Sequence, residues 1–221
     1  MIRFFDILFS LLALIVLLPI FIPIMIILKF TGEGEVFYLQ ERIGENEKPF
    51  NLIKFATMLK DSANIGTGEM TVSNDPRVLP FGKFLRKTKI NELPQLLNIL
   101  KGDMSVIGPR PQTKKYYYAF SEEVRKDISQ VVPGLSGIGS IVFRDEESMV
   151  KDMGDPVSFD LNYKHPYKGK LEKWFVENRN IIIYFQLIIL TVLAVIKPEK
   201  KFYKSWLKDL PKPPKELEQF I

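Results

Sequence analysis

The side chains in this sequence best suited to chemistry are carboxylates and cations, and several of them gather between residues 85 and 111. This stretch, LRKTKINELPQLLNILKGDMSVIGPRP, contains Arg86, Glu92 and Arg110. Carboxylates can hold Mg²⁺ or attack phosphorus, and arginine forks neutralise phosphoryl oxygens bidentately. Any one of these residues alone would be read as half of a surface ion pair. Together on one local scaffold they indicate phosphate chemistry.

Other residue types are scarce enough to exclude several kinds of site. The chain has no cysteine and a single histidine, His165, so Cys-ligated zinc, thiol nucleophiles, His-based metal sites and Ser-His-Asp triads are excluded. We expect His165 to be a surface or turn residue before Pro166. Gly66 and Gly68 lack the context of a nucleotide-binding fingerprint. The further charged candidates are Glu41, Asp103, Asp145, Lys54, Arg77, Lys87 and Arg144.

A helix must position the central acid. Leucines at 93, 96, 97 and 100 have helical spacing, Asn91 suits an N-cap, and Gly102 is a natural stop. The start of such a helix favours an anion. Arg110 lies between Pro109 and Pro111, in a rigid extended turn. We therefore predict that Arg86, Lys87 and Arg110 converge on one phosphate near this helix start.

The elements around this helix form a mixed pattern. Apolar and β-branched runs at 36–40 and 50–55, separated by GENEKP, predict a hairpin or two short strands. Residues 60–80 predict a long polar loop. Residues 112–131 predict another helix, and a Gly-rich loop at 132–140 precedes a predicted strand at 141–143. The fold class expected is α/β, mainly α, with amphipathic interfacial helices.

The apolar run at 7–30 is long enough to enter a membrane. By hydropathy alone, the run could be a straight transmembrane span. It fits a cleaved signal peptide poorly, because Asp6 precedes the run and no cleavage site follows it. Pro19 and Pro23 favour a kink. Arg3 before the run and the basic part after it both prefer the cytoplasmic side. We predict a re-entrant helix-break-helix.

Composition predicts one main domain with appendages. The 221 residues carry a formal charge of +5 with a pI near 9.2, which suits phosphates or an anionic membrane surface better than nucleic acid. The second apolar run, 181–196, could be a buried or an interfacial helix. We divide the chain into an anchor at 1–30, a domain at 31–196 and a basic, aromatic tail at 197–221. The tail suits the headgroup layer, and a solvated end is the simpler alternative.

Three stretches of this sequence resemble the bacterial sugar transferase family, the monotopic phosphoglycosyl transferases. They are RKTKINELPQLLNILKGDMSVIGPRP, VFYLQERIGENEKPFNLIKFATM and VPGLSGIGS, and the resemblance runs from the N-terminal anchor to about residue 196. It implies a re-entrant helix and a domain on the cytoplasmic face of the bacterial inner membrane. It also implies transfer of a sugar 1-phosphate from a UDP-sugar to undecaprenyl phosphate, with UMP released and Mg²⁺ required. This would be the first membrane step of capsule, O-antigen, exopolysaccharide or glycoprotein assembly, upstream of other glycosyltransferases.

The resemblance also implies roles for individual residues. In the family an Asp-Glu pair precedes Leu-Pro; the Asp attacks the β-phosphate and the Glu supports the metal. Glu92 matches the Glu, but Asn91 stands at the nucleophile position, and Ala56 stands where the family often has Arg. The residues that the resemblance assigns to phosphate or nucleotide binding are Lys54, Arg86, Pro109, Arg110 and Arg144.

Four interpretations of Asn91 are open. Glu92 or another acid could take over as nucleophile, with Asn91 as an oriented hydrogen-bond donor. The protein could be catalytically weak, or the sequence could carry a deliberate Asp→Asn substitution. Finally, Asn91 could serve only as a helix cap. The rival function from another class is a non-catalytic, membrane-bound binder of nucleotide sugar or polyprenyl phosphate.

Overall fold

The computed structural model describes residues 1–66, 68, 71, 75–144, 149 and 155–221. Asp145 lies outside this part of the chain. The elements that position the site are, in chain order, α1 (Ile2–Phe30), β1 (Phe37–Ile43), η1 (Glu45–Glu47), β2 (Pro49–Phe55), η2 (Ser62–Asn64), α2 (Pro80–Lys87), η3 (Ile90–Gln95), α3 (Leu96–Lys101), β3 (Ser105–Ile107) and α4 (Lys114–Tyr117). The remaining elements are α5 (Glu122–Ile128), β4 (Gly134–Ser136), α6 (Ile138–Val142), α8 (Pro156–Phe159), η4 (Asp160–Lys164), α9 (His165–Asn178), α10 (Ile181–Ile196), α11 (Tyr203–Trp206) and α12 (Lys215–Glu218).

The predicted hairpin is confirmed, with longer strands than expected. β1 and β2 pair antiparallel, with Phe37 opposite Phe55 at one end and Ile43 opposite Pro49 at the other. The turn between them, η1, places Asn46 at a φ of 55°, a left-handed conformation that asparagine tolerates. Alternating side chains of β2 then reach different apolar clusters, so the hairpin is held from both faces.

The Gly-rich segment forms the second, smaller sheet instead of a loop. β4 pairs in parallel with β3, and a Cβ on Gly134 would lie 2.0 Å from the Gly108 backbone nitrogen, so glycine is required for this approach. The strand predicted at 141–143 is wrong, because residues 138–142 form α6. Ile138, Ile141 and Val142 are buried at helical spacing. Such a short apolar run does not distinguish a strand from a buried helix.

The single helix predicted over 112–131 is two helices. α4 ends at Tyr117, and α5 starts after Ser121, whose hydroxyl accepts a hydrogen bond from the Val124 nitrogen (3.4 Å). Glu122 and Glu123 in the first turn of α5 suit the positive end of its dipole. The break lets Phe120 turn inward, where it is buried near Ile43 and Ile128.

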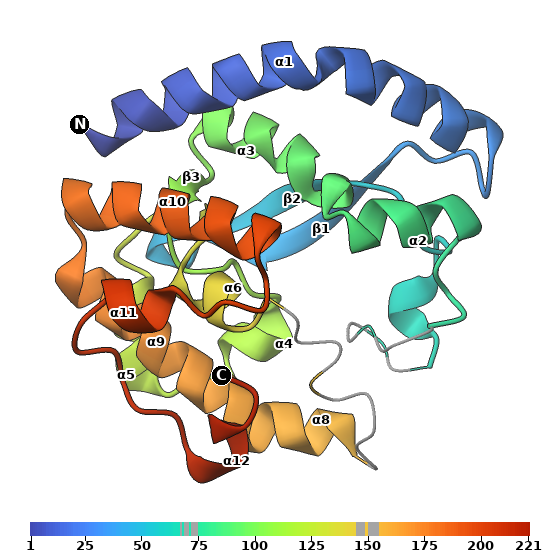
Figure 1. The fold of residues 1–221 in the computed structure, drawn as a ribbon. Coiled ribbons are helices and arrows are strands. Elements are labelled where there is room, and N and C mark those ends of the chain that lie inside the picture. The colour runs from blue at the N-terminus through green and yellow to red at the C-terminus, as the bar shows by residue number, and fades with distance from the viewer. Residues whose placement is uncertain (67, 69–70, 72–74, 145–148, 150–154) are drawn as a thin grey trace.

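The N-terminal apolar segment is one helix, so the predicted break at the prolines is wrong. α1 runs from Ile2 to Phe30 with Pro19 and Pro23 inside it, and it is long and apolar enough to cross a membrane. Figure 1 shows α1 as an arch over α3 and the hairpin. Packing against the domain explains the missing break, since Phe21, Ile24 and Leu28 lie in a cluster with residues of β2 and α2. The re-entrant topology stays a prediction.

Polar contacts also hold the first turns of α1. The Arg3 guanidinium donates to the carbonyls of Ile99 (2.6 Å) and Leu100 (2.9 Å) at the end of α3. The buried Asp6 carboxylate accepts hydrogen bonds from the Ser105 hydroxyl and the Tyr184 hydroxyl. Both ends of α1 are therefore attached to the same domain.

The C-terminal part of the chain completes the core. α10 buries Tyr184, Leu187 and Leu190 and leaves its other face exposed. The tail at 197–221 packs against the domain, because Leu207 and Leu217 are buried in the same apolar cluster as α9 and α10. The tail is also bonded to α9, since the Tyr167 hydroxyl donates to the Pro211 carbonyl (2.7 Å). Its predicted place at the membrane surface stays a prediction.

Candidate active site

A cleft of about 510 Å³ lies between the hairpin, the α2–η3 corner and the start of α9, and we call it the central cleft. Five of the predicted site residues line it, and they are Lys54, Arg86, Asn91, Glu92 and Arg110. These residues come from three separate segments of the chain. Arg86 and Arg110 therefore lie in one cleft with Glu92, and their binding of one phosphate stays a prediction.

The segment that carries Asn91 and Glu92 is a 3₁₀ turn instead of the start of an α-helix. Lys89 adopts a φ of 59° after α2 and turns the chain, and the α-helix α3 begins only at Leu96. The cap interpretation of Asn91 is wrong, because Lys89 is the N-cap residue and Asn91 lies inside the turn. Ile90 and Leu93 pack on the cluster around Phe55, which fixes the orientation of the turn.

Asn91 itself is buried, at 5% exposure, and lies on the wall of the central cleft. Its Oδ1 atom has no hydrogen-bond partner within the described part of the chain. A buried polar atom without a partner is costly, and such atoms are concentrated where a ligand supplies the missing contact. Asn91 therefore lines the cleft beside Glu92 and holds a buried side-chain oxygen whose hydrogen bonding is unsatisfied.

Glu92 and Arg110 form the central ion pair. Arg110 Nη2 lies 2.9 Å from Glu92 Oε1, and Nη1 lies 3.5 Å from Oε2. Although burial alone raises the pKa of Glu92, the charges of Arg110 and Lys54 hold the pKa of this carboxyl well below its usual range. Glu92 is therefore ionised at any working pH. Its side chain keeps 17% exposure, which leaves it accessible from the cleft.

The hairpin supplies a second group of cations. Gln40, Arg42 and Lys54 share one face of it, and the Gln40 amide oxygen accepts from Arg42 Nη2 (2.6 Å) and Lys54 Nζ (3.3 Å). Burial and the neighbouring charge of Arg42 lower the pKa of Lys54 to about 7, against the opposing charge of Glu92. A bound phosphate would stabilise the charged form of this lysine.

Other predicted residues lie outside the central cleft. Lys87 and Arg144 line a neighbouring cleft, while Pro109 accepts a hydrogen bond from the Gly134 nitrogen (2.8 Å) and so fixes the loop that carries Arg110. Asp103 accepts from the Asn98 amide (3.1 Å), beneath the hairpin. Lys87 shares the neighbouring cleft with Arg86, which lines both clefts, but Lys87 does not line the central cleft with Arg110. The meeting of all three cations at one phosphate therefore stays a prediction.

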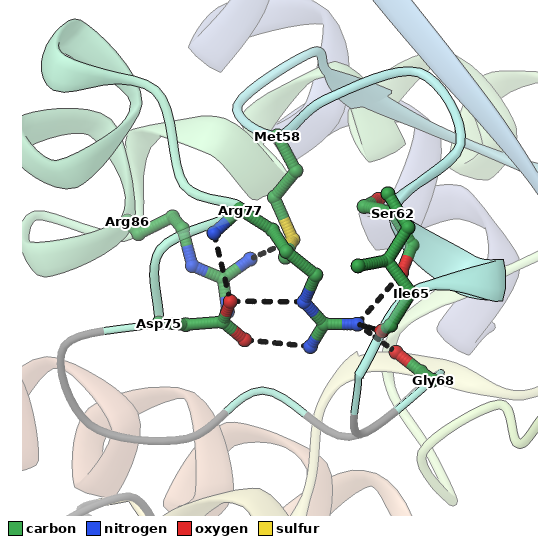
Figure 2. A network of polar contacts seen from close by, with 7 residues as sticks. All are labelled: Met58, Ser62, Ile65, Gly68, Asp75, Arg77 and Arg86. Atoms are coloured by element: carbon green, nitrogen blue, oxygen red, sulfur yellow. Dashed lines mark hydrogen bonds and ion pairs between the residues drawn. The ribbon is translucent and has the colours of Figure 1, made fainter.

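Arg77 is buried beneath the loop at 58–78. Its guanidinium lies 2.6 Å from the Asp75 carboxylate, and Nη1 donates to the carbonyls of Ser62 (2.6 Å), Ile65 (2.7 Å) and Gly68 (2.6 Å). Figure 2 shows this guanidinium between the carboxylate and the three carbonyls. Arg77 therefore folds the loop that borders the cleft, and its 4% exposed side chain does not face a substrate.

Sequence reasoning missed the wall opposite Glu92. Asp160, Lys164, His165 and Lys168 line the cleft from the π-helix η4 and the start of α9. The prediction that His165 is a surface or turn residue is wrong, because His165 is buried at the start of α9. It stacks on Phe120 with ring centroids 3.9 Å apart, and burial lowers its pKa to about 4. The spacing of Asp160 and Lys164, which form an ion pair at 2.5 Å, was the available signal.

Comparisons with known proteins agree with this geometry. A family model described as "Bacterial sugar transferase" matches residues 1–198. The chain is 33% identical over 208 residues to "Exopolysaccharide production protein ExoY" of Sinorhizobium fredii, covering 87% of this chain and 84% of that protein. It is 36% identical over 165 residues to the "UDP-glucose:undecaprenyl-phosphate glucose-1-phosphate transferase" of Escherichia coli, covering 72% of this chain and 34% of the longer relative.

Proposed function

Because this chain belongs to the bacterial sugar transferase family, we propose that it transfers a sugar 1-phosphate from a UDP-sugar to undecaprenyl phosphate and releases UMP. The observation that carries this proposal is the Glu92–Arg110 pair, which lies in one cleft with Lys54 and Arg86. The Escherichia coli relative is named as a transferase of glucose 1-phosphate from UDP-glucose to undecaprenyl phosphate. The non-catalytic binder is therefore not favoured. Such a reaction serves exopolysaccharide or related glycan synthesis, in which other glycosyltransferases extend the lipid-linked sugar.

The cations of the central cleft suit the diphosphate of the donor. Arg110 and Arg86 present planar guanidinium groups, which pair with phosphoryl oxygens, and Lys54 adds a point charge. Positive charge placed before the reaction stabilises the charge that develops on the transferred phosphoryl group and on UMP. Glu92 on its 3₁₀ turn and Lys54 on the hairpin are held by elements that pack on the same apolar cluster, while Arg86 is supplied by α2 and Arg110 by the loop after β3.

We assign the attack on phosphorus to Glu92. A carboxylate oxygen of Glu92 forms a bond to the β-phosphorus while the bond from that phosphorus to the bridging oxygen breaks, and UMP leaves with this oxygen. An oxygen of undecaprenyl phosphate then attacks the same phosphorus, and the Glu92 carboxylate is released. Asn91 beside it orients the phosphate. Another cleft acid, Asp160, is held by Lys164 on the opposite wall.

Mg²⁺ fits this site in part. The described residues contain no group of three or more His, Cys, Asp or Glu side chains that could hold a metal ion. Mg²⁺ is, however, commonly bound by one or two protein oxygens together with substrate phosphates and water. Glu92 and the unpartnered Oδ1 of Asn91 are the groups that would hold it. Bound there, Mg²⁺ would neutralise charge on the donor diphosphate.

We place the protein at the bacterial inner membrane, with its catalytic domain on the cytoplasmic face. The long apolar helix α1 supports membrane attachment. A nucleotide sugar is a cytoplasmic metabolite, so the central cleft must open to that side. The attachment of both ends of α1 to one domain supports a helix that enters and leaves the membrane on the same face.

The test measures UMP release from full-length protein in lipid nanodiscs, with UDP-sugars, Mg²⁺ and undecaprenyl phosphate. We expect Glu92→Gln to lose activity at least about 100-fold, because the amide cannot attack phosphorus. Glu41→Gln is the matched control, since Glu41 is exposed on β1 and does not line the cleft. Without acceptor, the peptide that contains Glu92 should gain the mass of a sugar phosphate.

Asn91→Asp separates the remaining interpretations of this position. If Glu92 attacks, the native chain turns over and Asn91→Asp changes the rate modestly. If the native chain releases no UMP but Asn91→Asp does, the role of Glu92 is contradicted. The native site would then be intact except for its missing nucleophile at position 91. Full activity in Glu92→Gln would also contradict it. The absence of UMP release from the native chain and from Asn91→Asp, with every donor sugar tried, would overturn the proposed function itself.

A further inference from the structure

A second cleft, of about 720 Å³, lies between the end of α2, the helices α6 and α10, and the C-terminal tail. We call it the tail cleft. The family match ends at residue 198, whereas Lys200, Lys201, Phe202, Tyr203 and Phe220 all line this cleft. One of its walls is therefore built by a segment that lies beyond the family match.

The described residues at the rim of the tail cleft are mostly basic. Among the described residues that line it, the cations are Lys83, Arg86, Lys87, Lys89, Arg144, Lys200 and Lys201, whereas the acids are Asp75 and Glu199. The Asp75 carboxylate forms an ion pair with the Arg77 guanidinium (2.6 Å). Burial and the charge of Lys204 lower the pKa of Lys201, so this lysine gains from a nearby anion. The rim therefore suits a ligand with a concentrated negative charge.

The floor of the tail cleft is apolar. Ile141 and Val142 of α6, Leu190 and Ala194 of α10, and Phe202 of the tail contribute to it. The residues of α10 that follow Ala194 in the chain are also apolar and exposed, since Val195 is 55% exposed and Ile196 is 65% exposed. The floor and the end of α10 both offer apolar side chains to a hydrocarbon chain. The ligand that fits both rim and floor is an anion attached to a long apolar chain.

The tail cleft adjoins the central cleft. Thr71, Arg86 and Lys89 line both clefts, so a phosphate held at the rim lies next to the site of Glu92 and Arg110. The tail wall is fixed in place, because Lys204 Nζ donates to the terminal Ile221 carbonyl (2.8 Å) and Tyr203 is buried. The wall is thus a built part of the domain.

We propose that the tail cleft binds the acceptor, with the phosphate of the polyprenyl phosphate at the basic rim and its first isoprene units on the apolar floor. This inference rests on the proposed function and adds a role for the C-terminal tail as a wall of the acceptor site. A UDP-sugar does not fit as well, because it has no hydrocarbon for the floor. An anionic phospholipid shares the headgroup charge, and the experiment separates it from the acceptor.

The first experiment measures binding directly, in full-length protein in phosphatidylcholine nanodiscs. The probe is a polyprenyl phosphate with a photoreactive group in its first isoprene units, and mass spectrometry locates the crosslinked peptides. We expect crosslinks to peptides of α10 and the tail, and competition by undecaprenyl phosphate. Undecaprenol, inorganic phosphate and phosphatidylglycerol should not compete. Equal competition by phosphatidylglycerol would overturn the proposal in favour of a general anionic-lipid surface, and protection by UDP-sugar alone would overturn it in favour of a donor site.

The second experiment reverses the charge of the tail rim. Lys200→Glu/Lys201→Glu should raise the KM for undecaprenyl phosphate about tenfold, because two favourable charges become repulsive. The KM for the UDP-sugar should stay unchanged. Lys212→Glu/Lys215→Glu is the matched control, since both lysines are exposed in the same tail and neither lines the cleft. Thermal unfolding of both variants checks that the fold is intact.

The outcomes are distinct from those that test the proposed function. An unchanged acceptor KM in Lys200→Glu/Lys201→Glu would overturn the acceptor site even if UMP release is normal. If UMP release fails in the native chain, crosslinking still reports whether the tail cleft holds a polyprenyl phosphate. Crosslinks only to α1, with none in α10 or the tail, would also overturn the proposal.

Discussion

Glu172 connects the core of the domain to the loop of the active site. This carboxylate on α9 is 1% exposed, and its Oε1 accepts a hydrogen bond from the Arg110 backbone nitrogen (3.3 Å). Oε2 has no partner among the described residues. Burial raises the pKa of Glu172 to about 7, although the charges of Lys168 and Arg110 oppose this shift. Gly139 packs directly on the carboxylate, where a Cβ would lie 2.4 Å from Oε1.

The raised pKa predicts that the protein loses stability as pH rises. Between its ordinary pKa near 4.5 and about 7, the folded state holds a proton on Glu172 that the unfolded chain has lost, so the free energy of unfolding decreases over this window. The total effect is on the order of 3 kcal/mol. Glu172→Gln should match the native melting temperature at pH 4 and exceed it at pH 8.

Glu177→Gln serves as the control for this prediction, because Glu177 lies on the same helix with its side chain 57% exposed. Its melting temperature should follow that of the native chain at both pH values. Parallel melting curves for Glu172→Gln and the native chain across the window would contradict the assignment of this proton to Glu172.

At the scale of elements, the loop at 58–78 depends on one buried side chain. Arg77 gathers the carbonyls of η2 and of Gly68, while Asp75 neutralises its charge (Figure 2). The loop returns to the domain where Met58 and Val78 form an isolated antiparallel bridge. Because Met58, Ser62 and Gly68 also line the central cleft, the contacts of Arg77 with Ser62 and Gly68 support one wall of the site.

Replacing Arg77 with lysine should open this loop. Lysine keeps the charge but cannot bond the carboxylate bidentately and reach three carbonyls at once, so Arg77→Lys should cost about 2–4 kcal/mol of unfolding free energy. Limited proteolysis should then cut between residues 58 and 78 faster than in the native chain. Arg179→Lys, at an exposed position after α9, should change neither measurement. Native-like proteolysis of Arg77→Lys would show that the loop does not depend on the guanidinium.

At the scale of the whole molecule, α1 and the domain form one body. A helix of 29 residues is about 43 Å long, yet its first turns contact α3 and β3 while its last turns contact β2 and α2. A straight span would carry one of these ends to the other side of the membrane. Its outward side chains are apolar along the whole helix, including Leu12, Ile15 and Val16. This arrangement lets α1 enter the bilayer sideways, as a monotopic anchor.

Labelling of single cysteines tests this topology, which the absence of native cysteine makes simple. We expect a cysteine added before Met1 and a cysteine at Thr31 to react with a membrane-impermeant maleimide only after cells are lysed. Glu122→Cys, on the exposed start of α5, marks the side of the domain. Labelling of the N-terminal cysteine in intact cells, with Thr31→Cys protected, would establish a straight span.

The local sequence was sufficient for features that depend on neighbouring residues. The apolar and β-branched runs at 36–40 and 50–55 predicted the β1–β2 hairpin, and the apolar run at 7–30 predicted a membrane segment where α1 lies, because such runs are properties of a short segment. The motif around Glu92 and Arg110 identified the family and the phosphate chemistry. The seven residues of β1 and of β2 exceeded the predicted lengths, since their ends are set by pairing.

Only the tertiary structure decided which of these groups meet. Lys54, Glu92 and Arg110 come together across long stretches of chain, while Arg77 turned to Asp75 and His165 was buried against Phe120. It also placed Asn91 inside a 3₁₀ turn on the wall of the cleft, with a buried oxygen that has no partner among the described residues. Such outcomes depend on the packing of distant segments, whose free energies no local pattern records. The sequence therefore determined the chemistry of this protein, and packing determined which atoms are in position to perform it.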